Sequence, residues 1–281
     1  MSDGDGSWSA GQASPPGRQT AVVCCDLDGV IWRGDEAIVP AADGVRRLRA
    51  AGLRVGFVSN NSSQPVGDVV AKLARFGVPA TTEEVLTSAE AAASLLAADL
   101  SPGARVLVCA GPGVVEALGA VGLTPVRDAP ADAVVVGFHR DFDFDGLARA
   151  SAAVRSGARF VATNLDATYP MPGGTMLPGA GSIAAAVATA SGRTPEVAGK
   201  PEAATVALVR ARFGDAGIVV GDRPSSDGAL ADALGWPFGL VLSGVTAEVP
   251  PPGGEAIPVP RPPFVAADLG ELAPRLVAAL T

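Results

Sequence analysis

The sequence is poor in lysine, tyrosine, asparagine, histidine and cysteine, and each scarcity narrows what the chain can be. The three cysteines, Cys24, Cys25 and Cys109, are odd in number and do not suggest a disulfide framework. We therefore expect a reducing compartment, the cytoplasm. No run of basic residues occurs and the net charge is −8, so nucleic acids and anionic membrane surfaces are not expected partners. No apolar run approaches the roughly 18 residues that span a membrane.

The N-terminal residues have neither a basic start nor an apolar stretch, so a secretory signal is not expected. Residues 1–19 are rich in Gly, Ser and Pro and predict a disordered tail. The chain has 281 residues, of which 48% are hydrophobic. It is therefore long enough for a substantial core in one large domain or two modest ones.

Short apolar runs alternate with alanine-rich stretches, which predicts strands that alternate with helices in a parallel α/β sheet. The pattern restarts after residues 101–104. We therefore predict a core domain, 20–101 and 195–281, with a second α/β domain, 102–194, inserted into it. Ser88 is the expected N-cap of a helix over 88–100, and the Pro-rich segment 249–264 is expected to be extended at the surface. Strands are expected at 21–26, 53–60, 105–111, 132–138, 159–164 and 239–245, with a long apolar strand and its exit at 216–227. Helices are expected at 41–52, 65–77, 88–100, 113–122, 144–157, 181–192, 228–235 and 268–280.

Polar side chains follow several of the predicted buried strands. Ligands of open parallel sheets bind beyond the carboxyl ends of the strands, so these side chains are expected to converge. Their types suit phosphoryl transfer, because a carboxylate can attack phosphorus and a second acid nearby can protonate the leaving alkoxide. Carboxylates also suit Mg²⁺, while a lysine and a serine can hold phosphoryl oxygens. The converging residues are Asp26, Asp28, Ser59, Asn60, Asn61, Lys200, Asp222 and Asp227.

The segments "DLDGV", "VSNNSS", "GKP" and "GDRPSSDGALADALG", in this order, resemble the four motifs of the phosphatases of the haloacid dehalogenase superfamily. The resemblance covers the chain from about residue 21 to its end and implies a Rossmann-like parallel-sheet core with an inserted α/β cap domain. It implies Asp26 as the nucleophile that forms an aspartyl-phosphate, and Asp28 as the general acid and then base. It also implies that Ser59, Asn60, Asn61 and Lys200 hold the phosphate, that Asp26, Asp222 and the Asp28 carbonyl bind Mg²⁺, and that Asp227 lies behind these metal ligands.

The inserted segment resembles the large (type IIA) cap of the branch that contains glycerol-3-phosphate, phosphoglycolate, pyridoxal-phosphate and p-nitrophenyl-phosphate phosphatases. In that branch the loop after "ATN" overhangs the site, so Asn164, Asp166 and Tyr169 are expected to contact substrate. The resemblance implies a Mg²⁺-dependent phosphomonoester hydrolase acting on a small phosphorylated metabolite. Glycerol 3-phosphate is the first choice, while phosphoglycolate, pyridoxal phosphate, sugar phosphates and nucleotides stay open. The resemblance also allows a homodimer formed through the cap.

Two other classes of protein share parts of this pattern. A phosphomutase usually carries a small helical cap after the first motif, and the short stretch between Asp28 and Ser59 leaves no room for one. A catalytically silent protein that binds a phosphorylated metabolite would be expected to lose the nucleophile or a metal ligand. Neither is lost here, which favours the enzyme.

Lysine, asparagine and tyrosine are encoded by AT-rich codons, and their scarcity here is typical of a GC-rich genome. The few that remain are therefore less easily explained by drift and deserve weight as functional candidates. Of the two lysines, Lys200 falls in a motif, which favours a function, whereas Lys72 lies mid-helix and is expected to be a solvated surface residue. The single histidine, His139, lies in the predicted cap far from the motifs, so we do not expect it to be catalytic. Cys24 and Cys25 are expected to pack as small hydrophobic residues.

Overall fold

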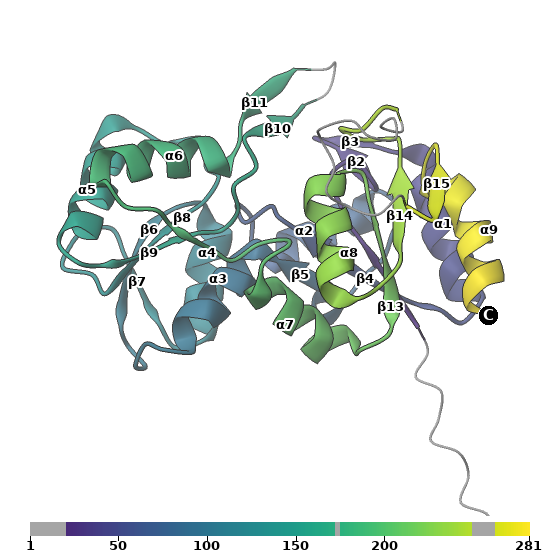
Figure 1. The fold of residues 1–281 in the computed structure, drawn as a ribbon, viewed down its shortest axis with the longest axis horizontal. Coiled ribbons are helices and arrows are strands. Elements are labelled where there is room, and N and C mark those ends of the chain that lie inside the picture. The colour runs from purple at the N-terminus through teal and green to yellow at the C-terminus, as the bar shows by residue number, and fades with distance from the viewer. Residues whose placement is uncertain (1–20, 172–174, 249–261) are drawn as a thin grey trace, which may run out of the picture.

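The computed structural model describes residues 21–171, 175–248 and 262–281, which form two α/β domains that lie side by side (Figure 1). The strands of the core domain are β1 (Val22–Cys25), β4 (Arg54–Ser59), β5 (Val85–Thr87), β13 (Gly217–Gly221), β14 (Phe238–Val241) and β15 (Phe264–Ala266). They form a six-stranded parallel sheet in the order β15-β14-β13-β1-β4-β5. β1 lies near its centre, so residues that follow β1 are flanked by the ends of β13 and β4.

Helices cover both faces of the core sheet, and β1 contributes alternately to the two sides. Val23 and Cys25 pack in a cluster with three helices, whereas Val22 and Cys24 pack on the opposite face with two others. This alternation is that of any extended strand. The helices of the first face are α1 (Val39–Ala50), α2 (Val66–Arg75) and α9 (Leu269–Leu280), and those of the second are α7 (Ala203–Phe213) and α8 (Ala229–Leu234).

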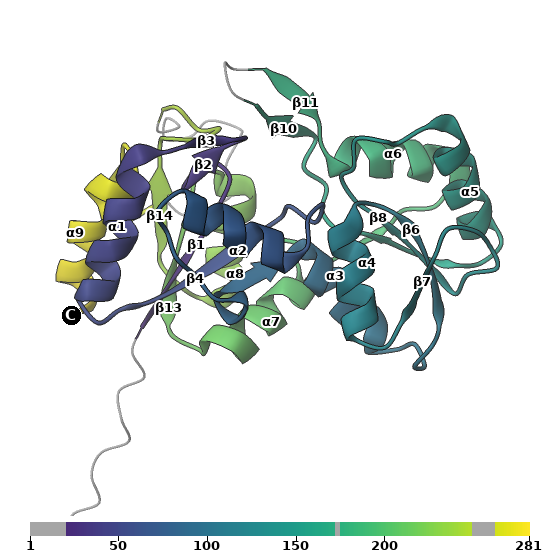
Figure 2. The same cartoon turned by 180° about the vertical axis from the view of Figure 1, so that it is seen from behind.

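The second domain is a five-stranded parallel sheet whose strands are β6 (Arg105–Cys109), β7 (Thr124–Val126), β8 (Ala133–Val136), β9 (Arg159–Ala162) and β12 (Glu196–Val197), in the order β12-β9-β8-β6-β7. Its helices are α3 (Ser88–Ala97), α4 (Pro112–Ala120), α5 (Phe144–Arg155) and α6 (Ala180–Ser191). α3 follows the core strand β5 directly, yet Ala92 and Leu96 are buried in one cluster with Val106 and Val135 of the second sheet. Partly buried Leu208 of α7 packs on the same cluster. α3 and α7 therefore join the two domains, as Figure 2 shows from behind.

Two short hairpins stand beyond the carboxyl end of the core sheet. The first, β2 (Trp32–Arg33) with β3 (Glu36–Ala37), follows β1, and the second, β10 (Thr168–Pro170) with β11 (Met176–Pro178), rises from the second domain on the side of the core (Figure 1). A short 3₁₀ helix, η1 (Thr82–Glu84), precedes β5, and a π-helical turn, η3 (Pro224–Gly228), follows β13. The hairpins and the turn place side chains near the point where β1 ends.

The predicted fold, a parallel-sheet α/β core with an inserted α/β domain, is confirmed. The boundary at residue 195 is wrong, because β12 pairs in parallel with β9 and so belongs to the second sheet. Ser88 is not the N-cap of α3. Thr87 takes that position, and its side chain and that of Glu90 each bond the other's backbone N–H. The predicted tail, 1–19, and residues 249–261 of the Pro-rich segment lie outside the described residues, whereas Phe264, which ends that segment, begins β15.

Within the described ranges, no helix combines the length and the apolar character needed to cross a bilayer.

Candidate active site

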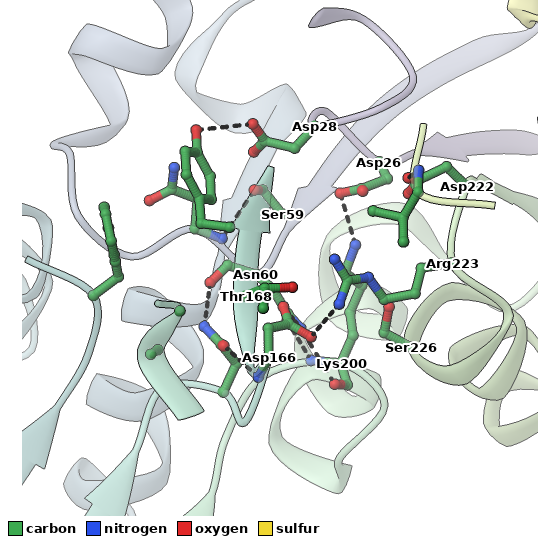
Figure 3. A pocket seen from close by; sticks show the side chains of 17 residues that line it. Asp26, Asp28, Ser59, Asn60, Asp166, Thr168, Lys200, Asp222, Arg223 and Ser226 are labelled. Carbon is green, nitrogen blue, oxygen red and sulfur yellow. Dashed lines mark hydrogen bonds and ion pairs between the residues drawn. The ribbon is translucent and has the colours of Figure 1, made fainter. Parts of the chain in front are cut away.

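Apart from Asp227, which lies just behind, the predicted site residues line one small cavity of about 60 Å³ at the carboxyl end of the core sheet (Figure 3). The core contributes acidic residues that follow β1 and β13, the hydroxyl that ends β4, and the lysine that precedes α7. The second domain closes the cavity with residues of the loop after β9 and of the β10–β11 hairpin. The residues lining the cavity include Asp26, Asp28, Ser59, Asn60, Asn61, Asn164, Asp166, Tyr169, Lys200 and Asp222.

Lys200 is the centre of the charge arrangement. Its Nζ donates to Oδ1 of Asp26 at 2.7 Å, to Oδ1 of Asp227 at 2.7 Å and to the carbonyl of Val58 at 2.9 Å. The Lys200 side chain is only 3% exposed. Burial alone would lower the pKa of Lys200, but Asp227 and Asp26 outweigh burial and raise it. The lysine is therefore a fixed cation whose three protons are all directed.

Three carboxylates face this single ammonium. Oxygen atoms of Asp26, Asp222 and Asp227 lie within 4.8 Å of one another. Burial raises the pKa of Asp26 despite the opposing charge of Lys200, and burial together with Asp227 raises the pKa of Asp222 to about 6. The cluster thus contains three carboxyl groups but only one ammonium, that of Lys200, to balance their negative charge.

A hard divalent cation fits this donor set, because Mg²⁺ prefers carboxylate oxygens. Asp26 and Asp222 are the carboxylates available to hold it. Both oxygens of Asp227 are engaged, Oδ1 by Lys200 and Oδ2 by the backbone N–H of Arg223 at 3.1 Å. Asp227 is therefore less free than the other two to hold a metal ion, and its place behind the metal ligands stays a prediction. A bound Mg²⁺ would supply the missing positive charge and polarise phosphate oxygens.

Glycines make room for the acidic cluster. A Cβ on Gly29 or on Gly244 would collide with the carboxylate of Asp222, and a Cβ on Gly221 would collide with that of Asp227. Gly29 also has φ +88°, a conformation that glycine adopts easily. The backbone N–H of Val245 donates to Oδ2 of Asp222 at 2.5 Å. The loop after β14 thus fixes Asp222 through a backbone N–H, a role that sequence reasoning missed because a backbone donor leaves no signature in the sequence.

The loop after β4 is held in a fixed shape by its own side chains. The N–H of Asn61 donates to Oγ of Ser59 at 3.0 Å, and Oδ1 of Asn61 accepts from the N–H of Ser63 at 3.0 Å. Oδ1 of Asn60 accepts from the N–H of Lys200 at 2.8 Å, and the Asn60 carbonyl accepts from the hydroxyl of Ser88 at 2.6 Å. The two asparagine side chains therefore shape the loop, while the Ser59 hydroxyl lines the cavity.

Residues of the second domain clamp this loop. Nδ2 of buried Asn164 donates to the Asn60 carbonyl at 2.6 Å, and Nδ2 of Asn60 donates to Oδ2 of Asp166 at 3.2 Å. Oδ1 of Asp166 also lies 3.5 Å from Nη1 of Arg223, which follows β13. Asn164 and Asp166 thus form hydrogen bonds and an ion pair with residues of the core domain. Their contact with substrate stays a prediction. Arg223 was missed as a site residue, although it stands inside the fourth motif.

Asp28 lies apart from the acidic cluster and has different partners. Its Oδ1 accepts from Nε1 of Trp32 at 3.0 Å and from the hydroxyl of Tyr169 at 3.1 Å. Burial raises the pKa of Asp28, against the opposing effects of Lys72 and of these two hydrogen bonds. A carboxyl group with a raised pKa is suited to donating a proton. The two acids of the first motif therefore occupy distinct electrostatic environments.

Lys72, expected at the surface, is instead largely buried, and that prediction is wrong. Its side chain is 11% exposed, with Nζ 4.4 Å from the centre of the Trp32 ring and donating to the Gly34 carbonyl at 2.6 Å. The β2–β3 hairpin, which the sequence did not predict, covers this part of α2. His139 lines a neighbouring open cleft rather than the site cavity, and its Nδ1 lies 3.0 Å from the carbonyl of Gly137.

The geometry defines a phosphoryl-transfer site on a Rossmann-like core, and comparison with known families agrees. Residues 23–124 match the haloacid dehalogenase-like hydrolase family, and residues 197–272 match a second model of HAD-like hydrolases. The chain belongs to the haloacid dehalogenase-like hydrolase family, as the four motifs indicated.

Similar proteins include several that are named as phosphatases. D-glycerol 3-phosphate phosphatase of Mycobacterium tuberculosis is 43% identical over 252 residues, which cover 88% of this chain and 69% of that protein. The crystal structure of glycerol phosphate phosphatase from the same organism in complex with magnesium superposes with a TM-score of 0.81 at 41% identity, covering 90% of this chain and 77% of that one. A p-nitrophenyl phosphatase from Archaeoglobus fulgidus gives a TM-score of 0.81 at 30% identity, covering 92% and 100%. The chain is therefore a phosphatase, and the prediction of Mg²⁺ as cofactor is confirmed by the relative solved with magnesium.

Proposed function

We propose that this phosphatase hydrolyses a small phosphorylated alcohol, with D-glycerol 3-phosphate as the first candidate, through an aspartyl-phosphate on Asp26. The observation that carries the proposal is the pairing of two acids in different environments. Asp26 faces Lys200 and the acidic cluster, whereas Asp28 faces two neutral donors. Such a division suits a nucleophile and a proton donor.

Each residue then has a defined task. The Asp26 carboxylate attacks phosphorus while Lys200 and the Ser59 hydroxyl hold the phosphoryl oxygens. Asp28 gives its proton to the departing alkoxide, and afterwards takes a proton from the water that hydrolyses the aspartyl-phosphate. Mg²⁺, held by Asp26, Asp222 and the Asp28 carbonyl, would reduce the electrostatic repulsion between the negatively charged phosphate and the attacking carboxylate.

The substrate assignment rests on similarity. The similar mycobacterial protein is named for D-glycerol 3-phosphate. The Tyr169 side chain lines the cap side of the cavity and is the candidate contact for the leaving group. Phosphoglycolate, pyridoxal phosphate, sugar phosphates and nucleotides are the competing substrates. The proposal also includes a cytoplasmic location and a homodimer formed through the cap.

A panel of phosphomonoesters, assayed for phosphate release with and without Mg²⁺, tests the proposal. We expect Mg²⁺-dependent turnover, with the highest kcat/KM for D-glycerol 3-phosphate. A higher kcat/KM for a nucleotide or a sugar phosphate would replace the proposed substrate. Absence of Mg²⁺-dependent turnover on every ester would overturn the proposed activity.

A further inference from the structure

Within the part of the chain that the structure describes, Oδ1 of Asp28 accepts two side-chain hydrogen bonds and Oδ2 accepts none. Nε1 of Trp32, in the core, and the hydroxyl of Tyr169, in the cap, both donate to Oδ1, at 3.0 and 3.1 Å. An indole N–H can only donate. The hydroxyl oxygen of a protonated carboxyl group accepts hydrogen bonds less well than its carbonyl oxygen. A proton on Asp28 is therefore favoured on Oδ2, where it displaces neither donor.

The Trp32 indole is held so that its N–H cannot turn away from Asp28. The residue is 3% exposed, and its carbonyl accepts from the N–H of Gly29 at 2.7 Å, which closes the turn between the two residues. Lys72 places Nζ 4.4 Å from the centre of the indole ring, and the Phe76 ring centre lies 5.9 Å away. The ammonium is itself fixed by its hydrogen bond to the Gly34 carbonyl. A cation above an indole ring is an attractive contact, so α2 supports the ring from behind.

The second donor reaches the same oxygen from the other domain. Tyr169 lies on β10, and its ring stacks on Phe138 at a centroid distance of 5.2 Å and an interplanar angle of 24°. The stack directs the phenol hydroxyl toward the core. Asp28 is thus held between one donor from the core and one donor from the cap.

We propose that Trp32 is a positioning residue for the general acid: together with Tyr169 it holds Oδ1 of Asp28 as the accepting oxygen and leaves Oδ2 to carry the proton to the leaving group. This inference rests on the proposed function. As a bond forms from an Asp26 oxygen to phosphorus, the ester P–O bond breaks, its electron pair stays on the leaving oxygen, and the proton on Oδ2 passes to that oxygen. The products are the free alcohol, the aspartyl-phosphate and the Asp28 carboxylate.

The leaving group provides the test, because only a strongly basic alkoxide needs the proton. Trp32→Phe removes the N–H and keeps an aromatic ring. We expect it to lower kcat/KM about tenfold for the alkyl phosphomonoester that the wild type hydrolyses best, and less than about twofold for p-nitrophenyl phosphate, whose phenolate leaves unaided. Tyr169→Phe should separate the two substrates in the same direction. Trp236→Phe is the matched control, since it removes an indole donor to the Asp215 carbonyl and should leave the ratio unchanged.

The outcomes separate the inference from the activity on which it rests. An equal fall of kcat/KM on both substrates, or no fall in Trp32→Phe, would overturn the positioning role. If the wild type hydrolyses neither ester, the proposed function itself is wrong. Circular dichroism and thermal melting establish that each variant is folded. If Trp32→Phe does not fold, Tyr169→Phe decides, because it removes the other donor to the same oxygen.

Discussion

The ammonium of Lys200 and the carboxylate of Asp227 form a buried ion pair, with Nζ 2.7 Å from Oδ1 and side-chain exposures of 3% and 1%. Asp227 anchors the lysine from the side away from the cavity, so that a second proton of Nζ is directed at Asp26. The pair fixes the position of the cation before any phosphate arrives, which is the preorganisation that electrostatic catalysis requires.

Removing that cation should damage stability and turnover together. Lys200→Met leaves the buried carboxylates uncompensated, and we expect the free energy of unfolding to fall by about 3 kcal/mol. Urea denaturation measures this, and phosphate release should fall at least about a hundredfold. Lys72→Met is the matched control in the other lysine. It removes one hydrogen bond, one cation–ring contact and a 3.7 Å pairing with exposed Asp35, and should lower the free energy of unfolding by only about 1 kcal/mol. Equal costs for the two variants would contradict the central place given to Lys200.

Asp26→Asn preserves the shape of the nucleophile and removes its charge. We expect turnover to fall below detection because an amide does not attack phosphorus as a carboxylate does. The melting temperature should stay within a few degrees of the wild type, since the hydrogen bond from Lys200 can still be accepted. Asp43→Asn, which alters an exposed acid paired with Arg46 and Arg47, serves as the control and should retain full activity. Near-normal turnover of Asp26→Asn would exclude Asp26 as the nucleophile.

Gly244→Ala tests the room made for Asp222. The added Cβ would collide with the Asp222 carboxylate, so we expect the Mg²⁺ concentration for half-maximal activity to rise about tenfold and stability to fall by about 1–3 kcal/mol. Gly119→Ala is the matched control, because among the described residues no atom beyond its own stretch of α4 lies within 4 Å of an added Cβ. That change should stabilise the protein slightly, by about 0.5–1 kcal/mol. An unchanged Mg²⁺ requirement in Gly244→Ala would show that the loop after β14 does not position the metal ligand.

The buried thiols predict a dependence on alkaline pH. Burial raises the pKa of Cys25 to about 12, with a further contribution from Asp26, and raises that of Cys109 to about 11. The folded protein therefore keeps these thiols protonated at pH 9, where the unfolded chain begins to release their protons. The free energy of unfolding should fall as the pH rises above about 9. Urea denaturation at several pH values checks the slope.

The same thiols should resist alkylation. Iodoacetamide at pH 8.5 should leave Cys24, Cys25 and Cys109 unmodified in the native protein, because all three are buried. It should modify all three once guanidinium unfolds the protein, and mass spectrometry measures the difference. Rapid labelling of Cys25 in the native protein would contradict its burial beneath the active site.

The sequence predicts the core of this architecture because parallel strands impose strong constraints. Apolar runs such as 21–26 are buried on both faces, and their carboxyl ends must meet at one edge, so Asp26, Ser59 and Asp222 could be grouped without coordinates. The catalytic roles of these residues stay predictions that the variants above test.

The missed features depend on contacts that leave no local pattern. A two-residue strand such as β2 has no periodicity, so the burial of Lys72 against Trp32 could not be read from the helix that carries it. β12 is equally short. It pairs with β9, which would otherwise be the edge strand of the second sheet, at the point where the chain passes back to the core domain. The pairing of Arg223 with Asp166 joins two domains, and their relative placement is a tertiary property.

The order of the strands has a consequence for biosynthesis. Lys200 and Asp26 are 174 residues apart in the chain, and β1 has β13 as one of its two neighbours, which is made only after the entire second domain. Domains fold as units while the chain is synthesised, whereas long-range parallel pairing waits for its partner. The second domain, contiguous in the chain, can therefore fold on the ribosome beside an incomplete core sheet. The newborn enzyme gains its catalytic centre only when nearly all of its chain has emerged.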